Sequence, residues 1–217
     1  MSKHLQNDLE KLKRHLLAIG ALVEDGVENA TKAFFTRDVE LAKKVIQNDD
    51  VVDEYEVDVE EECLKLLALY QPVARDLRFI ASVIKVNSDL ERMGDYCVKI
   101  AKRTLSLSKD PPIEIPVQIT KMVQLAKGMV RDSLDAFSKK DAAGSRKIVI
   151  RDDEVDALQK ETFRLLRKQM QEEPKNIEQF LDLVTVAQGV ERIADLSTNI
   201  AEDVVYMVEG EIIRHKE

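Results

Sequence analysis

The sequence predicts an all-α protein made of two tandem, pseudosymmetric three-helix bundles, with six long antiparallel helices in total. The composition is the first reason, because 217 residues with only 7 Gly, 5 Pro and 5% aromatic residues favour long helices over sheets. The second is an apolar repeat at helical spacing, which is clearest in Phe79, Ile80, Val83, Ile84, Val86, Leu90 and Met93. The third is an internal repeat that covers nearly the whole chain.

Prolines mark where the helices should end. Pro72 and Pro174 each interrupt a long helical pattern, and three more prolines cluster in a linker at residues 111–116. Asp38 and Asp141 follow short breaks in the apolar pattern, so we expect both to be N-cap residues. The expected helices span residues 3–36, 38–70, 73–107, 116–138, 141–172 and 175–209.

The internal repeat divides these helices into two sets of three. The first two helices of each set align 103 residues apart, so that Asp38 matches Asp141. After the proline turn the spacing falls to 100 residues, where Glu91-Arg92-Met93-Gly94-Asp95 matches Glu191-Arg192-Ile193-Ala194-Asp195. We therefore expect one three-helix bundle in residues 1–109 and a second in residues 116–217.

Acidic residues recur four positions apart at matching heights in both repeats. If the second and third helices of a bundle form an antiparallel hairpin around the turn proline, Asp49 lies level with Asp95 and Asp53 with Glu91. The same symmetry holds in the second repeat about Pro174. The sequence thus predicts two clusters of four carboxylates: Asp49, Asp53, Glu91 and Asp95, and then Asp152, Asp156, Glu191 and Asp195.

Three interpretations of these clusters stay open at this point. Like charges four residues apart cost a helix about 0.2–0.5 kcal/mol, so a bound cation would offset a real repulsion. An all-oxygen ligand set on facing helices suits iron, manganese, magnesium or calcium, whereas structural zinc takes Cys or His. The second interpretation is a salt-bridge network in which Arg92 and Arg192 neutralise the acids. It would be uneven, because the first repeat also has Lys99 and Lys102 where the second has Asn199 and Glu202. The third is an ordinary solvated face.

Other features exclude several classes of function. A formal net charge of −8 makes nucleic acid and anionic lipid poor partners. Cys63 and Cys97 form no metal or redox motif, and the polar start and short apolar runs favour a cytoplasmic protein with reduced thiols. No nucleotide-binding or hydrolase motif occurs, and we predict no catalytic residues. The three histidines, His4, His15 and His215, lie near the ends and form no Glu-x-x-His, which argues against oxygen-activating diiron chemistry.

Together these motifs resemble the PhoU family of phosphate-uptake regulators. The segments that carry the resemblance are the two Glu-Arg-x-x-Asp motifs, the helix-two segment from Asn48 to Asp53 and the turn from Tyr70 to Arg78. One departure is that the second repeat has Lys175-Asn176-Ile177-Glu178 where the first has Arg75-Asp76-Leu77-Arg78. If this corner contacts partners, the two halves are not equivalent.

The resemblance implies a cytoplasmic, non-enzymatic adaptor. Family members couple the phosphate ABC transporter, through its ATPase subunit, to the sensor histidine kinase of the phosphate regulon. They repress phosphate uptake and the starvation response when phosphate is plentiful, are often homodimers, and reach the membrane only through partners. Some bind multinuclear iron or other metals at the acidic motifs, which implies metal-ligand roles for the eight carboxylates named above. The alternatives are a metal-dependent hydrolase of phosphorylated substrates that uses the same carboxylates, and a purely structural helical spacer.

Overall fold

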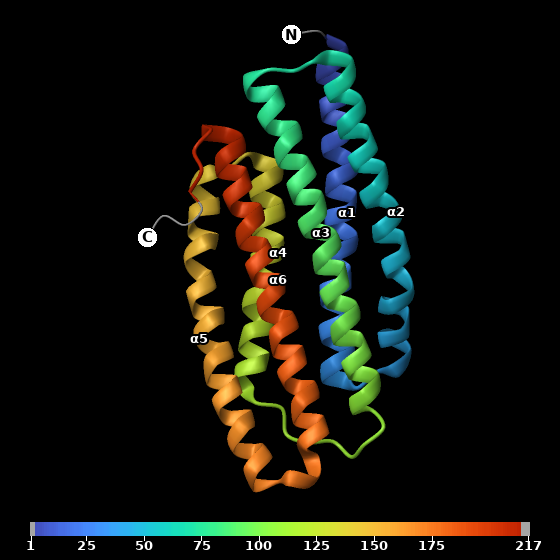
Figure 1. Cartoon of the computed structure of the whole chain (residues 1–217), viewed down its shortest axis with the longest axis vertical. Coiled ribbons are helices and arrows are strands. Elements are labelled where there is room, and N and C mark those ends of the chain that lie inside the picture. The colour runs from blue at the N-terminus through green and yellow to red at the C-terminus, as the bar shows by residue number, and fades with distance from the viewer. Residues whose placement is uncertain (1–2, 214–217) are drawn as a thin grey trace.

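The computed structural model describes residues 3–213, and six helices account for nearly all of them (Figure 1). No strand occurs in this range, so the prediction of an all-α protein is confirmed. Residues 1–2 and 214–217 of the two expected domains lie outside the described part, as does His215. The helices are α1 (Lys3–Thr36), α2 (Val39–Tyr70), α3 (Ala74–Leu107), α4 (Val117–Lys139), α5 (Ala142–Glu172) and α6 (Ile177–Glu209).

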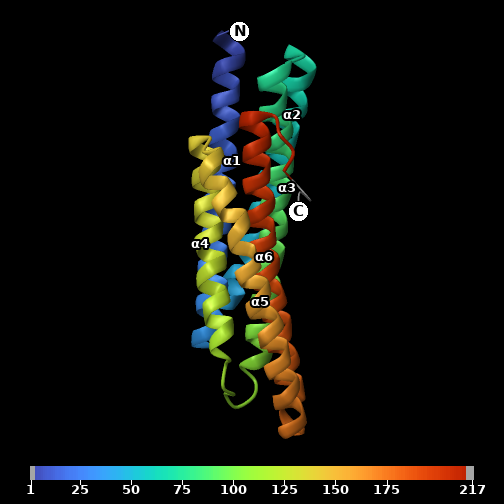
Figure 2. The ribbon, with the colours of Figure 1, turned by 90° about the vertical axis from the view of Figure 1, so that its left-hand side faces the viewer.

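The helices form two layers that place α3 and α6 at the centre. Figure 1 shows α3 and α6 side by side, with α2 and α5 on their outer flanks. In the perpendicular view of Figure 2, α1 and α4 lie together on one side of the molecule, and α3 and α6 lie on the other. Each repeat is thus a three-helix bundle, and the two bundles meet through the α3–α6 and α1–α4 contacts.

The same turn joins the first two helices of each repeat. The Asp38 carboxylate accepts a hydrogen bond from the Leu41 amide at 2.9 Å, and Asp141 accepts one from the Gly144 amide at 2.9 Å. The residues before these aspartates, Arg37 and Lys140, have φ values of 56° and 57°, which is the left-handed conformation that ends many helices. Both predicted N-caps are confirmed, and the shared geometry supports the repeat.

The turns between the second and third helices differ between the repeats. In the first, Gln71 caps α2 in the left-handed conformation, and α3 begins two residues after Pro72. In the second, Pro174 starts a short 3₁₀ turn, η1 (Pro174–Asn176), that leads directly into α6. A proline breaks the helical pattern in both cases, because its ring fixes φ and it has no amide hydrogen to donate.

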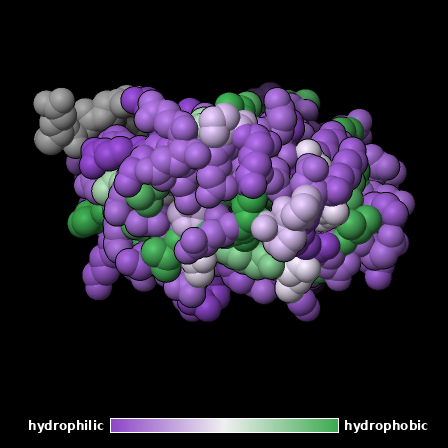
Figure 3. Space-filling view, turned by 90° about the horizontal axis from the view of Figure 1, so that it is seen from below, coloured by the Kyte–Doolittle hydropathy of each residue, from purple (hydrophilic) through white to green (hydrophobic). Residues whose placement is uncertain are grey.

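One hydrophobic core runs through both bundles. It includes fully buried residues from all six helices, among them Leu12, Val59, Ile80, Ile119, Val155 and Leu183. The surface, by contrast, is mainly hydrophilic at the end that carries the α5–α6 turn, where hydrophobic residues occur in separate spots (Figure 3). Within residues 3–213, no helix combines the length and the hydrophobicity needed to cross a membrane.

Polar contacts across α3 and α6 are also related by the repeat. The Arg103 guanidinium pairs with Asp182 at 3.2 Å, and the Ser82 hydroxyl donates to the Asp203 carbonyl at 3.3 Å. Residues 103 and 203 occupy equivalent positions, as do 82 and 182, so the two contacts are related by an approximate two-fold axis between the bundles. The pseudosymmetry predicted from the repeat is therefore visible in the packing.

Two acidic clusters as the candidate functional site

The first predicted cluster lies between α2 and α3. Asp49 and Glu91 are partly buried, whereas Asp53 and Asp95 are exposed. The pKa of Asp49 is raised from its ordinary value of 3.8 to about 6, chiefly because burial removes the carboxylate from water. The negative charges of Asp53 and Asp95 add to this rise, and the Lys102 charge opposes it. Burial raises the pKa of Glu91 as well, with further contributions from Asp95, Asp53 and Asp49, so all four carboxylates lie within electrostatic range of one another.

The second cluster repeats this arrangement between α5 and α6. Burial raises the pKa of Asp152 to about 6, and the charges of Asp195, Asp156 and Glu191 contribute next. The pKa of Glu191 is also raised by burial, although the neighbouring Arg192 charge lowers it. In each repeat, the four carboxylates that the sequence grouped thus lie within electrostatic range of one another.

Cations neutralise the two clusters only in part, and by different routes. In the first, the Lys99 ammonium lies 3.4 Å from Asp95. Arg92, expected to serve this cluster, pairs instead with Asp89 at 3.5 Å. In the second cluster Arg192 lies 2.8 Å from Asp195 and 3.5 Å from Glu191. The two clusters therefore differ in their ion pairs, as predicted. Among residues 3–213, an arginine pairs with the clustered acids only in the second repeat.

The donor chemistry of both clusters suits a hard cation. Every potential ligand is a carboxylate oxygen, and partial burial with mutual repulsion means that a positive charge would relieve an existing electrostatic cost. In residues 3–213, however, no three His, Cys, Asp or Glu side chains converge closely enough to hold a metal ion. A cation would therefore require side chains such as the exposed Asp53 and Asp95 to turn inward.

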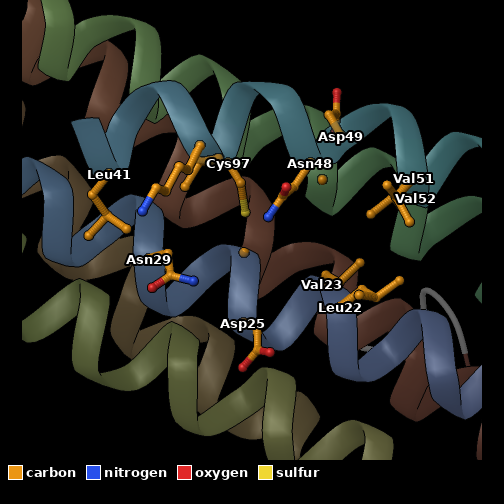
Figure 4. Close-up of a pocket in the computed structure, with 14 residues that line it drawn as sticks. Leu22, Val23, Asp25, Asn29, Leu41, Asn48, Asp49, Val51, Val52 and Cys97 are labelled. Atoms are coloured by element: carbon orange, nitrogen blue, oxygen red, sulfur yellow. The ribbon is translucent and has the colours of Figure 1, made fainter. Parts of the chain in front are cut away.

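A cavity of about 300 Å³ opens beside the first cluster, between α1 and α2 (Figure 4). Asn48 and Cys97 face it, and Asp49 lies at its edge. Its wall includes Gly26, where the second repeat has the fully buried Met129, so the two repeats differ in side-chain size at this position. Sequence reasoning missed this difference, although comparison of Gly26 with Met129 in the repeat alignment could have revealed it.

The raised pKa values predict how stability depends on pH in metal-free buffer. A carboxyl with a folded-state pKa of about 6, above its ordinary 3.8, holds its proton more tightly in the folded chain. The stabilising contribution is complete below about 3.8 and is lost as the pH rises through about 6. The melting temperature should therefore rise when the pH is lowered from about 7.5 to about 5.5.

The variant Asp49→Asn/Asp152→Asn should be more stable than the wild type at neutral pH and should show a smaller pH dependence. Each amide lacks the charge that burial and the neighbouring acids disfavour. Thermal unfolding across this pH range, in the presence of a chelator, measures both effects. A double variant that keeps the full wild-type pH dependence would show that other groups are responsible.

Comparison with known proteins places this fold and these motifs in one family. A family model, the PhoU domain, matches residues 16–104 and 119–204, which is one match for each repeat. The phosphate-specific transport system accessory protein PhoU homolog of Aquifex aeolicus is 41% identical over 212 residues, covering 98% of this chain and 96% of the relative. The homolog from Clostridium acetobutylicum is 34% identical over 209 residues, with 96% and 95% covered.

Solved structures agree with the sequence comparison over nearly the full length. The crystal structure of PhoU from Pseudomonas aeruginosa superposes with a TM-score of 0.92 at 37% identity, covering 95% of this chain and 99% of that chain. The phosphate transport system regulatory protein PhoU from Streptococcus pneumoniae gives a TM-score of 0.86 at 32% identity, with 96% and 99% covered. Since the matches span both repeats in sequence and in structure, the chain belongs to the PhoU family.

Proposed function

We propose that this protein is a regulatory accessory protein of phosphate-specific transport. The observation that carries the proposal is the full-length relationship, in sequence and in fold, to proteins named as accessory or regulatory components of that transport system. The absence of a nucleotide-binding or hydrolase motif in the sequence supports an adaptor rather than an enzyme.

The finer part of the proposal concerns partners. The protein couples the ATPase subunit of the phosphate ABC transporter to the sensor histidine kinase of the phosphate regulon, as a cytoplasmic homodimer. It represses uptake and the starvation response when phosphate is plentiful. Family resemblance supports these partners, and the acidic surface supports protein partners over nucleic acid.

The proposal also assigns metal binding to the acidic clusters. Asp49, Asp53, Glu91 and Asp95 would hold cations between α2 and α3, and Asp152, Asp156, Glu191 and Asp195 would hold them between α5 and α6. Iron is the first candidate, with manganese, magnesium or calcium as the others. A bound cation would supply positive charge that joins the two helices of each hairpin.

A reporter assay in cells tests the regulatory role. In a strain that lacks this protein, a promoter of the phosphate-starvation response should be active even in high phosphate, and the wild-type chain should restore repression. If metal at the first cluster is needed for regulation, Glu91→Ala/Asp95→Ala should repress weakly despite normal protein levels. Continued repression in the strain without the protein would contradict the regulatory proposal.

The chain offers a matched control for this variant. Glu54 and Asp58 form an exposed acidic pair with the same spacing on α2, but Glu54 corresponds to Ala157, so the pair is not repeated. Glu54→Ala/Asp58→Ala removes the same charge and should repress like the wild type.

Capture of the tagged protein from cells should recover the ATPase subunit or the kinase, and recovery of neither at high and low phosphate would contradict the adaptor role. Turnover of phosphate esters by the purified protein, lost in the cluster variant, would instead establish the hydrolase.

A further inference from the structure

A second cavity, of about 210 Å³, lies where the two repeats meet near the start of α3. It is lined by α1, by the first two turns of α3 and by the α4–α5 turn. Figure 2 shows the α4–α5 turn beside the upper part of α1. The Lys13 ammonium donates a hydrogen bond to the Ser138 carbonyl at 2.8 Å, which fixes this turn against α1.

Three cations from three elements line this cavity. They are Lys13 on α1, Arg75 on α3 and Lys140 in the α4–α5 turn. Within the described part of the chain, none of the three forms an ion pair with a carboxylate. The Lys140 ammonium lies 5.6 Å from the centre of the Phe79 ring, and that ring forms part of the cavity wall. Three positive charges without a carboxylate partner in one cavity favour an anion as ligand.

Two acidic residues, Glu10 and Asp76, line the same cavity and restrict which anion fits. A fully deprotonated oxyanion such as sulfate only accepts hydrogen bonds, so a carboxylate beside it repels it. Monohydrogen phosphate carries the same charge but keeps one hydroxyl, which can donate to a carboxylate. Guanidinium and ammonium groups together with a carboxylate acceptor therefore match monohydrogen phosphate better than sulfate.

We propose that this cavity binds inorganic phosphate. The Arg75 guanidinium and the ammonium groups of Lys13 and Lys140 would hold the anionic oxygens, and the carboxylate of Glu10 or Asp76 would accept a hydrogen bond from the phosphate hydroxyl. Because Lys140 belongs to the second repeat and the other two cations to the first, the bound anion would link the repeats. Phosphate would then bind the regulatory protein itself and act on it directly. The proposal goes beyond the proposed function and uses none of the eight clustered carboxylates.

Isothermal titration calorimetry on the full chain, in low salt with a chelator at about pH 7.5, tests the site. Inorganic phosphate should bind saturably with one site per chain, and sulfate should bind at least about tenfold more weakly. Arg75→Gln and Lys140→Gln should each weaken phosphate binding about tenfold or more. Asp76→Asn should reduce the difference in affinity between phosphate and sulfate, because it removes a negative charge that repels sulfate.

Lys139→Gln is the matched control for net charge. Lys139 is the neighbour of Lys140, but its ammonium pairs with Asp135 at 2.8 Å, and it does not line the cavity. This variant should bind phosphate like the wild type. A thermal melt of each variant without phosphate shows whether the fold is intact.

Several outcomes would overturn the proposal. One is that the wild type shows no saturable phosphate binding up to roughly 10 mM. Another is that Lys139→Gln weakens phosphate binding as much as Lys140→Gln does. A third is that the wild type binds sulfate as tightly as phosphate. The same titration is repeated with a phosphate monoester, phosphoserine. If the ester binds more tightly than inorganic phosphate, inorganic phosphate is not the ligand of this cavity. None of these outcomes would alter the reporter result, so failure of this site is distinguishable from failure of the regulatory role.

Discussion

Metal-free wild-type protein should gain thermal stability when Fe²⁺, Mn²⁺ or Mg²⁺ is added. A ligand that binds only the folded state stabilises it by about 2.7 kcal/mol at a hundredfold excess over its dissociation constant. For a chain of this size that corresponds to a rise of roughly 5–10 °C in melting temperature. The physical reason is that each cluster confines four carboxylates within electrostatic range, and cations cover them only in part.

Glu91→Ala/Asp95→Ala should lose the part of this gain that comes from the first cluster. Without added cations the same variant should differ little from the wild type, or be slightly more stable, because it relieves repulsion worth a few tenths of a kcal/mol per pair. Glu54→Ala/Asp58→Ala should keep the full cation response. Thermal unfolding of all three proteins, with and without each cation, gives the comparison. If the wild type is indifferent to every cation, the clusters are salt-bridge networks and the metal assignment is wrong.

Most of the fold could be predicted because its determinants are local. The apolar spacing fixes which stretches are helical, and proline fixes where two of the helix pairs turn. Asp38 and Asp141 were identifiable as caps because a short acceptor side chain before an apolar helical pattern has few other uses. The acidic clusters followed from the same local information, since residues equally far from a hairpin turn must lie level with each other.

What the sequence could not provide was the choice among competing partners. Arg92 and Arg192 occupy equivalent positions, yet Arg92 pairs with Asp89, whereas Arg192 pairs with Asp195 of the second cluster. The reason is that the second repeat has Gly189 where the first has Asp89, so Arg192 has no acidic neighbour at that position. The cavity between the repeats could not be predicted either, because Lys13, Arg75 and Lys140 are far apart in the chain and meet only once the bundles pack.

Gly189→Leu should destabilise the protein by about 3 kcal/mol, because Gly189 lies on α6 against α3 at the centre of the molecule. A β-carbon at this position would lie 3.2 Å from Ile100 Cγ1 and 3.9 Å from the Tyr96 carbonyl oxygen. The remaining atoms of a leucine would have to push the two central helices apart. Gly189→Ala should stay within about 1 kcal/mol of the wild type, since the gain in helix propensity offsets one tight contact.

Urea unfolding measures these differences and also tests how the bundles depend on each other. Because the core is continuous across α3 and α6, Gly189→Leu should lower the midpoint of a single transition, so that both repeats lose stability together. Gly128→Leu is the control, since a β-carbon there meets only the flexible end of Arg151 and should be tolerated. If the two repeats were independent domains, the wild type would unfold in two steps, and Gly189→Leu would leave the stability of each bundle nearly unchanged. A single transition that shifts as a whole would instead show that the α3–α6 interface holds the two repeats in one cooperative unit.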